Sequence, residues 1–189
     1  MTTVAIPHWN ALGLLPPIDP DRPASADRSP YRVSLPDVVQ RFATSPDRCQ
    51  ILSGLLAYRA ALHGIGVISG FQWLDGSFME NVERIEGRPP HDLDVVTFAE
   101  TRAVTRSPEA ALVFNHDRTK ARFGMDAYVV DLDGLVPSKL TTLAAYWYSM
   151  WSHRRNQAWK GYLQVELSPS EDARAAALLL LIAPAKETP

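Results

Sequence analysis

The chain has 189 residues, of which 46% are hydrophobic and 21% are charged, and its formal net charge is -2. A chain of this length suits one domain and buries about 70% of the surface of its unfolded form. The composition excludes a mostly disordered protein, and the length excludes a multidomain polymerase or synthetase. The near-neutral charge gives no support for non-specific binding to nucleic acid or to an anionic membrane.

Cysteine usage and hydropathy indicate a compartment. Cys49 is the single cysteine, so no internal disulfide can form, which fits a reducing environment. The first residues show no basic segment followed by an apolar run. The longest apolar run, residues 175–184, is about half as long as a bilayer requires. We therefore expect a cytoplasmic protein that does not contact a membrane.

Prolines punctuate residues 1–33, and each removes an amide donor and restricts the residue before it. We expect an extended proline-rich arm without long helices or central strands. We expect the arm to pack along the domain formed by residues 34–189, because it carries apolar anchors. These anchors are Ile6, Trp9, Leu12, Leu14, Leu15 and Ile18.

Helix start signals follow the arm. Ser34, with an acid three residues later, forms a capping-box pattern and predicts a helix over residues 35–43. Ser45 and Pro46 predict a second helix that ends at Gly64. Short helices are predicted at 78–82 and 108–114, an aromatic-rich helix at 138–151, and a last helix at 173–183.

Four segments predict strands, at residues 67–74, 92–98, 122–131 and 162–167. The last one alternates and suits a sheet edge. Residues 83–90 predict a loop because they include Gly87, Pro89 and Pro90. The order of these elements predicts an α/β (α+β) fold with a small mixed sheet and helices packed on one face.

Two acids begin the second predicted strand. Asp92 and Asp94 are two residues apart, so on a strand they project from the same face and can converge on a hard divalent cation such as Mg²⁺ or Mn²⁺. Asp126 interrupts the apolar third strand, and pairing of the two strands would add it to the site. Two carboxylates ~5 Å apart repel by roughly 3 kcal/mol, so three together need cations, protonation or full exposure, and a metal is the usual solution on packed strands.

The turn after the first predicted strand has features of a phosphate site. Gly76 would let a phosphate-bearing ligand approach the backbone. The Ser77 hydroxyl, with amides of a following helix, can hold phosphate oxygens. Ser77 could instead serve only as a helix cap.

Gly76–Ser77, Asp92–Leu93–Asp94 and Asp126 together resemble the signature of the nucleotidyltransferase superfamily, the fold of DNA polymerase beta. The spacer of fourteen residues, 78–91, is slightly longer than in that signature, and this departure bears on the shape of the nucleotide pocket. The fuller chain is similar to a family of bacterial nucleotidyltransferase-like proteins of this length. The segments that carry this wider similarity are Leu15–Pro16–Pro17, Arg41–Phe42, Arg48 and Trp159–Lys160–Gly161.

The resemblance implies an Mg²⁺- or Mn²⁺-dependent enzyme that moves a nucleoside monophosphate from a nucleoside triphosphate, with ATP as one candidate, to an acceptor, releasing pyrophosphate. The acceptor would be a protein, an RNA or a small molecule. Asp92 and Asp94 would bind both metal ions, and Asp126 would bind the catalytic one. The implied nucleotide-binding residues are Gly76, Ser77 and Lys160. The alternative is a regulatory protein of the same fold, antitoxin-like or part of phage defence, that acts through a protein partner.

Other polar and aromatic groups have simpler explanations. Asp131 and Asp133 precede Gly134 and are typical of a turn, with Asp131 the next candidate if Asp126 lies elsewhere. Several histidines and Cys49 show no ligand spacing for zinc; these histidines are His63, His91 and His116.

Two clusters near the C-terminal third leave alternatives open. An aromatic cluster favours helix packing over a base-stacking platform; it comprises Tyr146, Trp147, Tyr148 and Trp151. A basic cluster, residues 153–155, would either grip a triphosphate or polynucleotide or face solvent.

Overall fold

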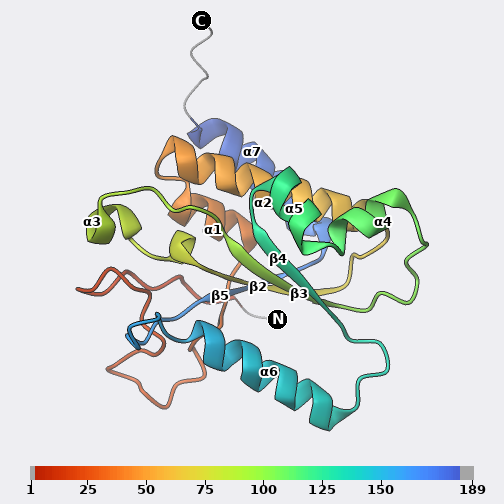
Figure 1. Cartoon of the computed structure of the whole chain (residues 1–189). Helices are drawn as coiled ribbons and strands as arrows, with labels where there is room; N and C mark the ends of the chain where they lie inside the picture. The colour runs from red at the N-terminus through yellow and green to blue at the C-terminus, as the bar shows by residue number, and fades with distance from the viewer. Residues whose placement is uncertain (1–2, 184–189) are drawn as a thin grey trace, which may run out of the picture.

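The computed structural model describes residues 3–183 and contains a five-stranded mixed sheet with the strand order β1-β5-β2-β3-β4 (Figure 1). The outer pairs, β1 with β5 and β3 with β4, are parallel, whereas β2 runs antiparallel to both β5 and β3. The strands are β1 (Tyr31–Arg32), β2 (Gly70–Asp75), β3 (Asp94–Ala99), β4 (Asp126–Asp131) and β5 (Leu163–Glu166). The predicted α/β class and small mixed sheet are confirmed.

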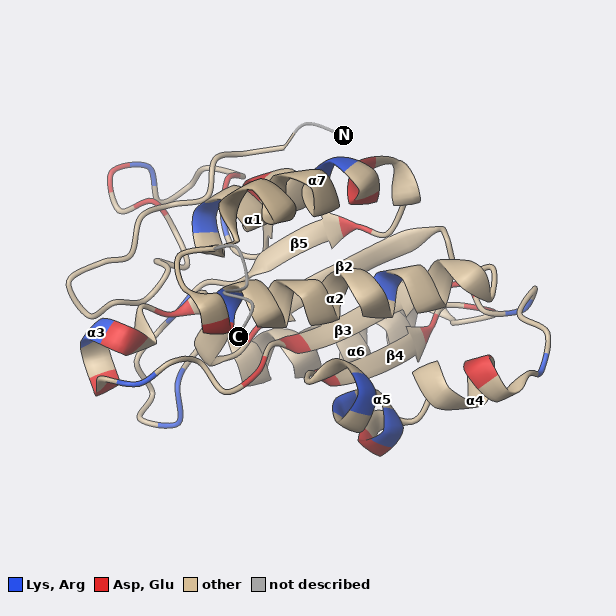
Figure 2. Cartoon of the chain, turned by 90° about the horizontal axis from the view of Figure 1, so that it is seen from above, with Lys and Arg blue, Asp and Glu red and all other residues tan. Residues whose placement is uncertain are grey.

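Helices cover both faces of the sheet. One face is covered by α1 (Leu35–Phe42), α2 (Pro46–Gly64), α4 (Pro108–Val113), α5 (His116–Phe123) and α7 (Asp172–Ile182). The opposite face is covered by α6 (Pro137–Trp151), as Figures 1 and 2 show. The expectation that helices pack on only one face was therefore wrong for α6. Within residues 3–183, none of the helices is both long and apolar enough to span a membrane.

The central strands explain why both faces need cover. Alternate residues of a strand project to opposite sides, and both sides of β2 and β3 carry buried apolar residues. Leu74 and Val95 belong to the larger core, which the five helices cover. Trp73 and Val96 belong to a second core, completed by Trp147 and Trp151 of α6. The aromatic residues of α6 that face the sheet thus pack as the sequence favoured.

The helices and strands around Asp92, Asp94 and Asp126 differ most from those predicted from the sequence. Helix α5 was not predicted, and it occupies the start of the expected 122–131 strand, so β4 begins at Asp126. Gly124, with φ of 70°, ends α5 and lets the chain turn into β4. Strand β3 begins at Asp94, so Asp92 precedes the strand. A 3-10 helix (Ser77–Met79) and helix α3 (Val82–Glu86) replace the expected short helix and much of the expected loop.

The N-terminal arm packs on the domain. Residues 3–30 contain no helix or strand, and Leu14 and Leu15 are each only 1% exposed. The indole of Trp9 donates a hydrogen bond to the Met79 carbonyl, 2.8 Å away, and the Gly161 amide donates to the Leu15 carbonyl at 2.7 Å. Residues 1–2 of the predicted arm and 184–189 of the predicted domain lie outside the described residues.

Two fully buried arginines of α2 fasten neighbouring elements. Arg59 pairs with Asp172 of α7 at 2.7 Å. Arg48 pairs with Glu83 at 2.6 Å and donates to the carbonyl oxygens of Phe78 and Glu80. Because buried guanidinium groups need several acceptors, Arg48 fixes the path of the chain that follows Gly76.

Candidate metal centre

Three aspartates form a row across one end of the sheet. Asp75, the last residue of β2, is the direct partner of Asp94 in β3, and Asp94 is the direct partner of Asp126 in β4. Partners on adjacent strands project from the same face, so the three carboxylates stand side by side. We call these three residues the acid row. Asp75 was missed by the sequence analysis, although an acid at the end of an apolar strand was its signal.

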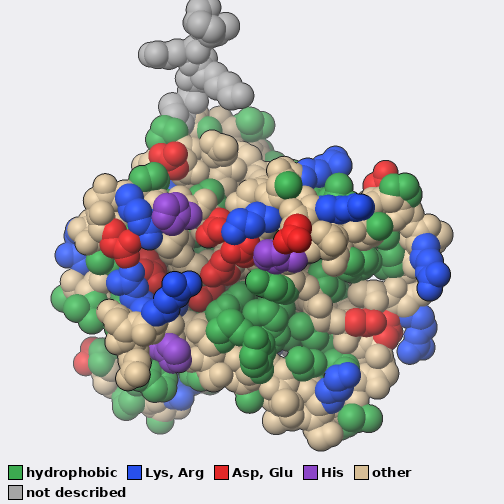
Figure 3. All heavy atoms as spheres, viewed as in Figure 1, with side chains coloured by type: hydrophobic (Ala, Val, Ile, Leu, Met, Phe, Trp, Pro, Cys, Tyr) green, Lys and Arg blue, Asp and Glu red, His purple; other side chains and the backbone are tan. Residues whose placement is uncertain are grey.

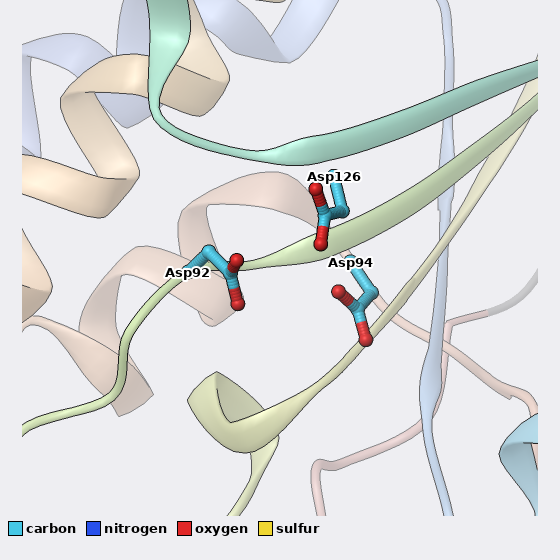
Figure 4. A group of neighbouring side chains, drawn as sticks. All are labelled: Asp92, Asp94 and Asp126. Atoms are coloured by element: carbon cyan, nitrogen blue, oxygen red, sulfur yellow. The ribbon is translucent and has the colours of Figure 1, made fainter. Parts of the chain in front are cut away.

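Asp92 joins two members of this row to form a tighter cluster. Asp92 lies just before β3 and turns its carboxylate toward those of Asp94 and Asp126, which Figure 4 shows. One carboxylate oxygen of each residue lies within 4.8 Å of the others. We call Asp92, Asp94 and Asp126 the aspartate triad. The pairing of the two strands, on which a place for Asp126 in the site depended, is present in the structure, and the triad offers the oxygen ligands that hard divalent cations prefer.

A lysine neutralises each end of the acid row. At one end, Lys160 Nζ lies 2.8 Å from both carboxylate oxygens of Asp75 and 3.5 Å from Oε1 of Glu80. At the other end, Lys120 Nζ lies 2.7 Å from Oδ1 of Asp126 and 3.1 Å from Oδ2 of Asp92. The row is therefore flanked by positive charge from two distant parts of the chain.

A histidine accompanies Lys120. Nε2 of His116 lies 3.2 Å from the same Oδ1 of Asp126. His116 and Lys120 are four residues apart on α5, so they project from the same side of that helix. Neither was predicted as a site residue. The only available signal was this helical spacing, just ahead of a strand that starts with an acid.

The central acid of the row has no cation of its own. The side chain of Asp94 makes no hydrogen bond or ion pair with any described residue. Burial, followed by the carboxylates of Asp75 and Asp92, raises the pKa of Asp94 from 3.8 to about 7, while Lys160 opposes the shift. Burial also raises the pKa of Asp75, although the Lys160 ammonium opposes that change. Asp94 is thus the carboxylate that gains most from a bound cation.

The described residues fit a divalent cation. Both side-chain oxygens of Asp94 are without partners among the described residues, whereas Oδ1 of Asp126 already lies 2.7 Å from Lys120 Nζ and 3.2 Å from Nε2 of His116. Unpartnered buried oxygens are costly, and a hard cation would satisfy them.

The Gly76–Ser77 turn lies against this cluster. Gly76 has a φ of 87°, and a Cβ at this position would lie 3.0 Å from Oδ2 of Asp94. Glycine therefore keeps space beside Asp94 and allows the turn. The Ser77 hydroxyl accepts a hydrogen bond from the His91 amide at 3.3 Å and does not cap a helix, so the capping alternative is not what the structure has.

A cleft of about 740 Å³ opens over the carboxylates. Asp75, Asp92 and Asp94 line one part of it, together with the Gly76–Ser77 turn and His91. Basic residues line another part; these are Arg88, His153, Arg154 and Arg155. Figure 3 shows acidic side chains gathered in a hollow with basic ones on both sides.

The basic residues of the cleft differ in how far they are already paired. Lys160 lines the cleft but is only 6% exposed and is bound to Asp75. Arg154 pairs with Glu80 and Glu86. Arg155 is exposed and has no ion pair with a described residue. Of the predicted basic groups, Arg155 is thus the most available to an anionic ligand.

The second Asp-x-Asp motif is turn chemistry, as expected. Oδ1 of Asp131 accepts a hydrogen bond from the Asp133 amide at 2.9 Å. Oδ2 of Asp133 accepts from the Thr101 amide, also at 2.9 Å. Both carboxylates therefore stabilise the end of β4, and neither belongs to the candidate metal centre.

Comparison with protein-family models places the chain in a family. Residues 7–166 match the model of a family of unknown function, DUF6932, so the chain belongs to that family. The matched region contains every residue of the acid row and the triad. Comparison with curated proteins found no match, and comparison with solved structures found none either.

Proposed function

For this member of DUF6932, we propose a magnesium-dependent nucleotidyltransferase, which transfers a nucleoside monophosphate from a nucleoside triphosphate to an acceptor and releases pyrophosphate. The observation that carries the proposal is the convergence of Asp92, Asp94 and Asp126, with Asp92 and Asp94 lining a cleft beside the Gly76–Ser77 turn. The same residues carry the resemblance to the nucleotidyltransferase superfamily.

The triad supplies the ligands for the metal. A bound Mg²⁺ would neutralise charge on the phosphates during transfer. Asp92 and Asp94 both line the cleft, so they would present the ion to a nucleotide there. Gly76 leaves the backbone accessible beside Asp94. The protein would then act chiefly by positioning the triphosphate and by electrostatic stabilisation.

The basic side of the cleft suits the phosphates. Arg155 and His153 are exposed and line the same cleft as the carboxylates. An arginine binds phosphate oxygens through two donors at once. A triphosphate lying across the cleft would meet the metal at one end and these groups at the other.

An apolar surface beside the acids suits a nucleobase. We call Tyr128, Tyr146 and Trp147 the aromatic shelf. Tyr128 and Trp147 have ring centroids 5.3 Å apart, and Tyr146 and Trp147 have theirs 5.4 Å apart. Tyr128 follows Asp126 by two residues on β4, so both project from the same face. Tyr128 and Tyr146 are 41% and 56% exposed, and bases stack on exposed aromatic side chains.

A second candidate function is regulation through a protein partner. Leu180 and Leu181 of α7 are 79% and 84% exposed, which is unusual for two adjacent leucines and suits contact with another protein. A regulatory protein of this kind would retain its fold, and its effect on the partner, after the carboxylates of the aspartate triad are replaced.

One experiment separates these functions. The protein is incubated with Mg²⁺, each of the four α-³²P nucleoside triphosphates in turn, and a lysate of its source cell. We expect one labelled acceptor, and loss of labelling in the Asp92→Asn/Asp94→Asn double variant. Asp117→Asn is the control, because its side chain is on α5 and is 96% exposed. Absence of labelling with every nucleotide, or equal labelling by the double variant, would refute the transferase.

A further inference from the structure

Lys120 already occupies one side of the aspartate triad. Its ammonium lies 2.7 Å from Oδ1 of Asp126 and 3.1 Å from Oδ2 of Asp92. A Mg²⁺ ion bound to those two oxygens would need to lie about 2.0–2.1 Å from each. The ion and the ammonium cannot share that space, so Lys120 fills the position between Asp92 and Asp126.

The fold places helix α5, which carries Lys120, beside the triad, and the Lys120 side chain is 48% exposed. At the start of helix α5, the Asn115 side chain accepts a hydrogen bond from the Arg118 amide. The helix ends at Gly124, directly before β4. Within α5, Thr119 is buried, and its hydroxyl donates a hydrogen bond to the Leu112 carbonyl at 3.1 Å. The helix therefore lies against the strand that carries Asp126. Figure 2 shows basic residues clustered on this short helix.

The other side of the triad is open. Both oxygens of Asp94 and Oδ1 of Asp92 have no hydrogen bond or ion pair with a described residue. Asp92 and Asp94 also line the cleft. A cation entering from the cleft would therefore meet these oxygens and not the pair that Lys120 bridges.

The charges agree with this division. Three carboxylates and one ammonium leave two negative charges, which one divalent cation cancels. A second divalent cation would add two positive charges beside Lys120, and like charges at this separation repel strongly. Retaining Lys120 and binding two metal ions are thus in conflict.

We infer that the centre takes one divalent cation, held by Asp92 and Asp94, and that the Lys120 ammonium fills the place of a second cation between Asp92 and Asp126. This inference rests on the proposed function and narrows it. Lys120 would thereby act as a positive charge beside the reacting phosphate, in place of a second metal ion.

The test counts metal ions by equilibrium dialysis. The full chain is dialysed against Mn²⁺ and the α,β-methylene analogue of ATP, GTP, CTP or UTP, and bound Mn²⁺ and bound nucleotide are both measured. We expect about one Mn²⁺ per nucleotide for the wild type, and about two for Lys120→Met and Lys120→Gln. Lys120→Arg, which retains the charge, should keep about one. Lys139→Met is the control, because Lys139 is an exposed lysine of α6.

Each outcome decides a different statement. About two Mn²⁺ ions in the wild type, or about one in both charge-removing variants, would overturn the inference about Lys120 and leave the nucleotidyltransferase proposal in place. Absence of bound Mn²⁺ and nucleotide from the wild type and every variant would overturn both. Circular dichroism spectra matching the wild type show that the variants are folded.

Discussion

Asp75 and Asp94 are direct neighbours on the same face of the sheet, yet their surroundings are opposite. Asp75 is 2% exposed and has both oxygens 2.8 Å from Lys160 Nζ. Asp94 faces the cleft and has no partner among the described residues. One row of acids thus contains a carboxylate that is paired internally and one that is not. Position on the sheet alone does not decide whether an acid is paired; the nearest cationic side chain does.

The largest expected effect comes from removing the lysine that pairs with Asp75. Lys160→Met should lower the free energy of unfolding by about 3–5 kcal/mol, because it leaves the Asp75 carboxylate buried without a counter-charge. Urea denaturation at pH 7 measures the change. The double variant Asp75→Asn/Lys160→Met should regain part of the loss, and Lys139→Met should stay within about 0.5 kcal/mol of the wild type. A Lys160→Met protein as stable as the wild type would remove the contrast between the two acids.

The second effect concerns the open member and its pH dependence. The pKa of Asp94 is about 7 in the folded protein, above its ordinary value of 3.8, so between these values the folded state holds a proton that the unfolded state releases. In a chelator, this group therefore makes stability fall as pH rises from about 4 to about 7. Asp94→Asn should remove that decline and raise the free energy of unfolding at pH 8 by roughly 2–3 kcal/mol, after allowance for solvent at the rim.

Urea denaturation across that pH range provides the measurement, with Asp117→Asn as the control that should keep the wild-type decline. If Asp94→Asn showed the same decline as the wild type, Asp94 would not be the acid in need of a cation.

A smaller effect probes the space beside Asp94. Gly76→Ala should cost about 2 kcal/mol, because φ of 87° disfavours a side chain and the new Cβ would crowd the Asp94 carboxylate. Gly87→Ala is a matched control: its φ is 65° and a Cβ there meets no atom within 4 Å, so it should cost only about 1 kcal/mol. Thermal or urea unfolding of both variants yields the difference. Equal losses would mean that Gly76 serves the turn alone.

The smallest effect on stability tests whether the open side extends to the aromatic shelf. Tyr146→Ala should change the free energy of unfolding by less than about 0.5 kcal/mol, because Tyr146 is 56% exposed. The same change should weaken binding of an Mg²⁺–nucleotide complex by about five-fold or more if a base stacks there. Isothermal titration calorimetry measures the affinity, with the exposed Leu140→Ala as the control. Unchanged affinity would confine the nucleotide to the carboxylate side.

Local patterns predicted the sheet and much of the triad. The strand-forming run after Asp94 and the acid within an apolar segment at Asp126 marked the two strands, and Asp126 was expected at the site on condition that they pair. Helix α5 was not predicted because Thr119 is the only buried residue among its eight, which leaves almost no apolar periodicity. Lys120 therefore had no predicted place near the triad.

Local patterns could not predict contacts between residues that are far apart in the sequence. The Asp75–Lys160 pair joins residues 85 positions apart, and no spacing rule connects them. Helix α6 lies on the second face because its two tryptophans, Trp147 and Trp151, pack there in the core that contains Trp73. Local signals reveal which residues can share a strand, but the cation that each acid meets depends on the full packing of the chain.

The contacts of the N-terminal arm have a consequence for the order of assembly during synthesis. Arm carbonyls accept hydrogen bonds from Asn81 and Arg84, at the start of α3, and from Gly161, just before β5. Ser29 and its partner Tyr162 are 133 positions apart, so the arm leaves the ribosome long before that partner is made. Contacts of such high sequence separation form late. The nascent chain therefore lacks the full surroundings of the aspartate triad until β5 emerges, when nearly all of the chain exists.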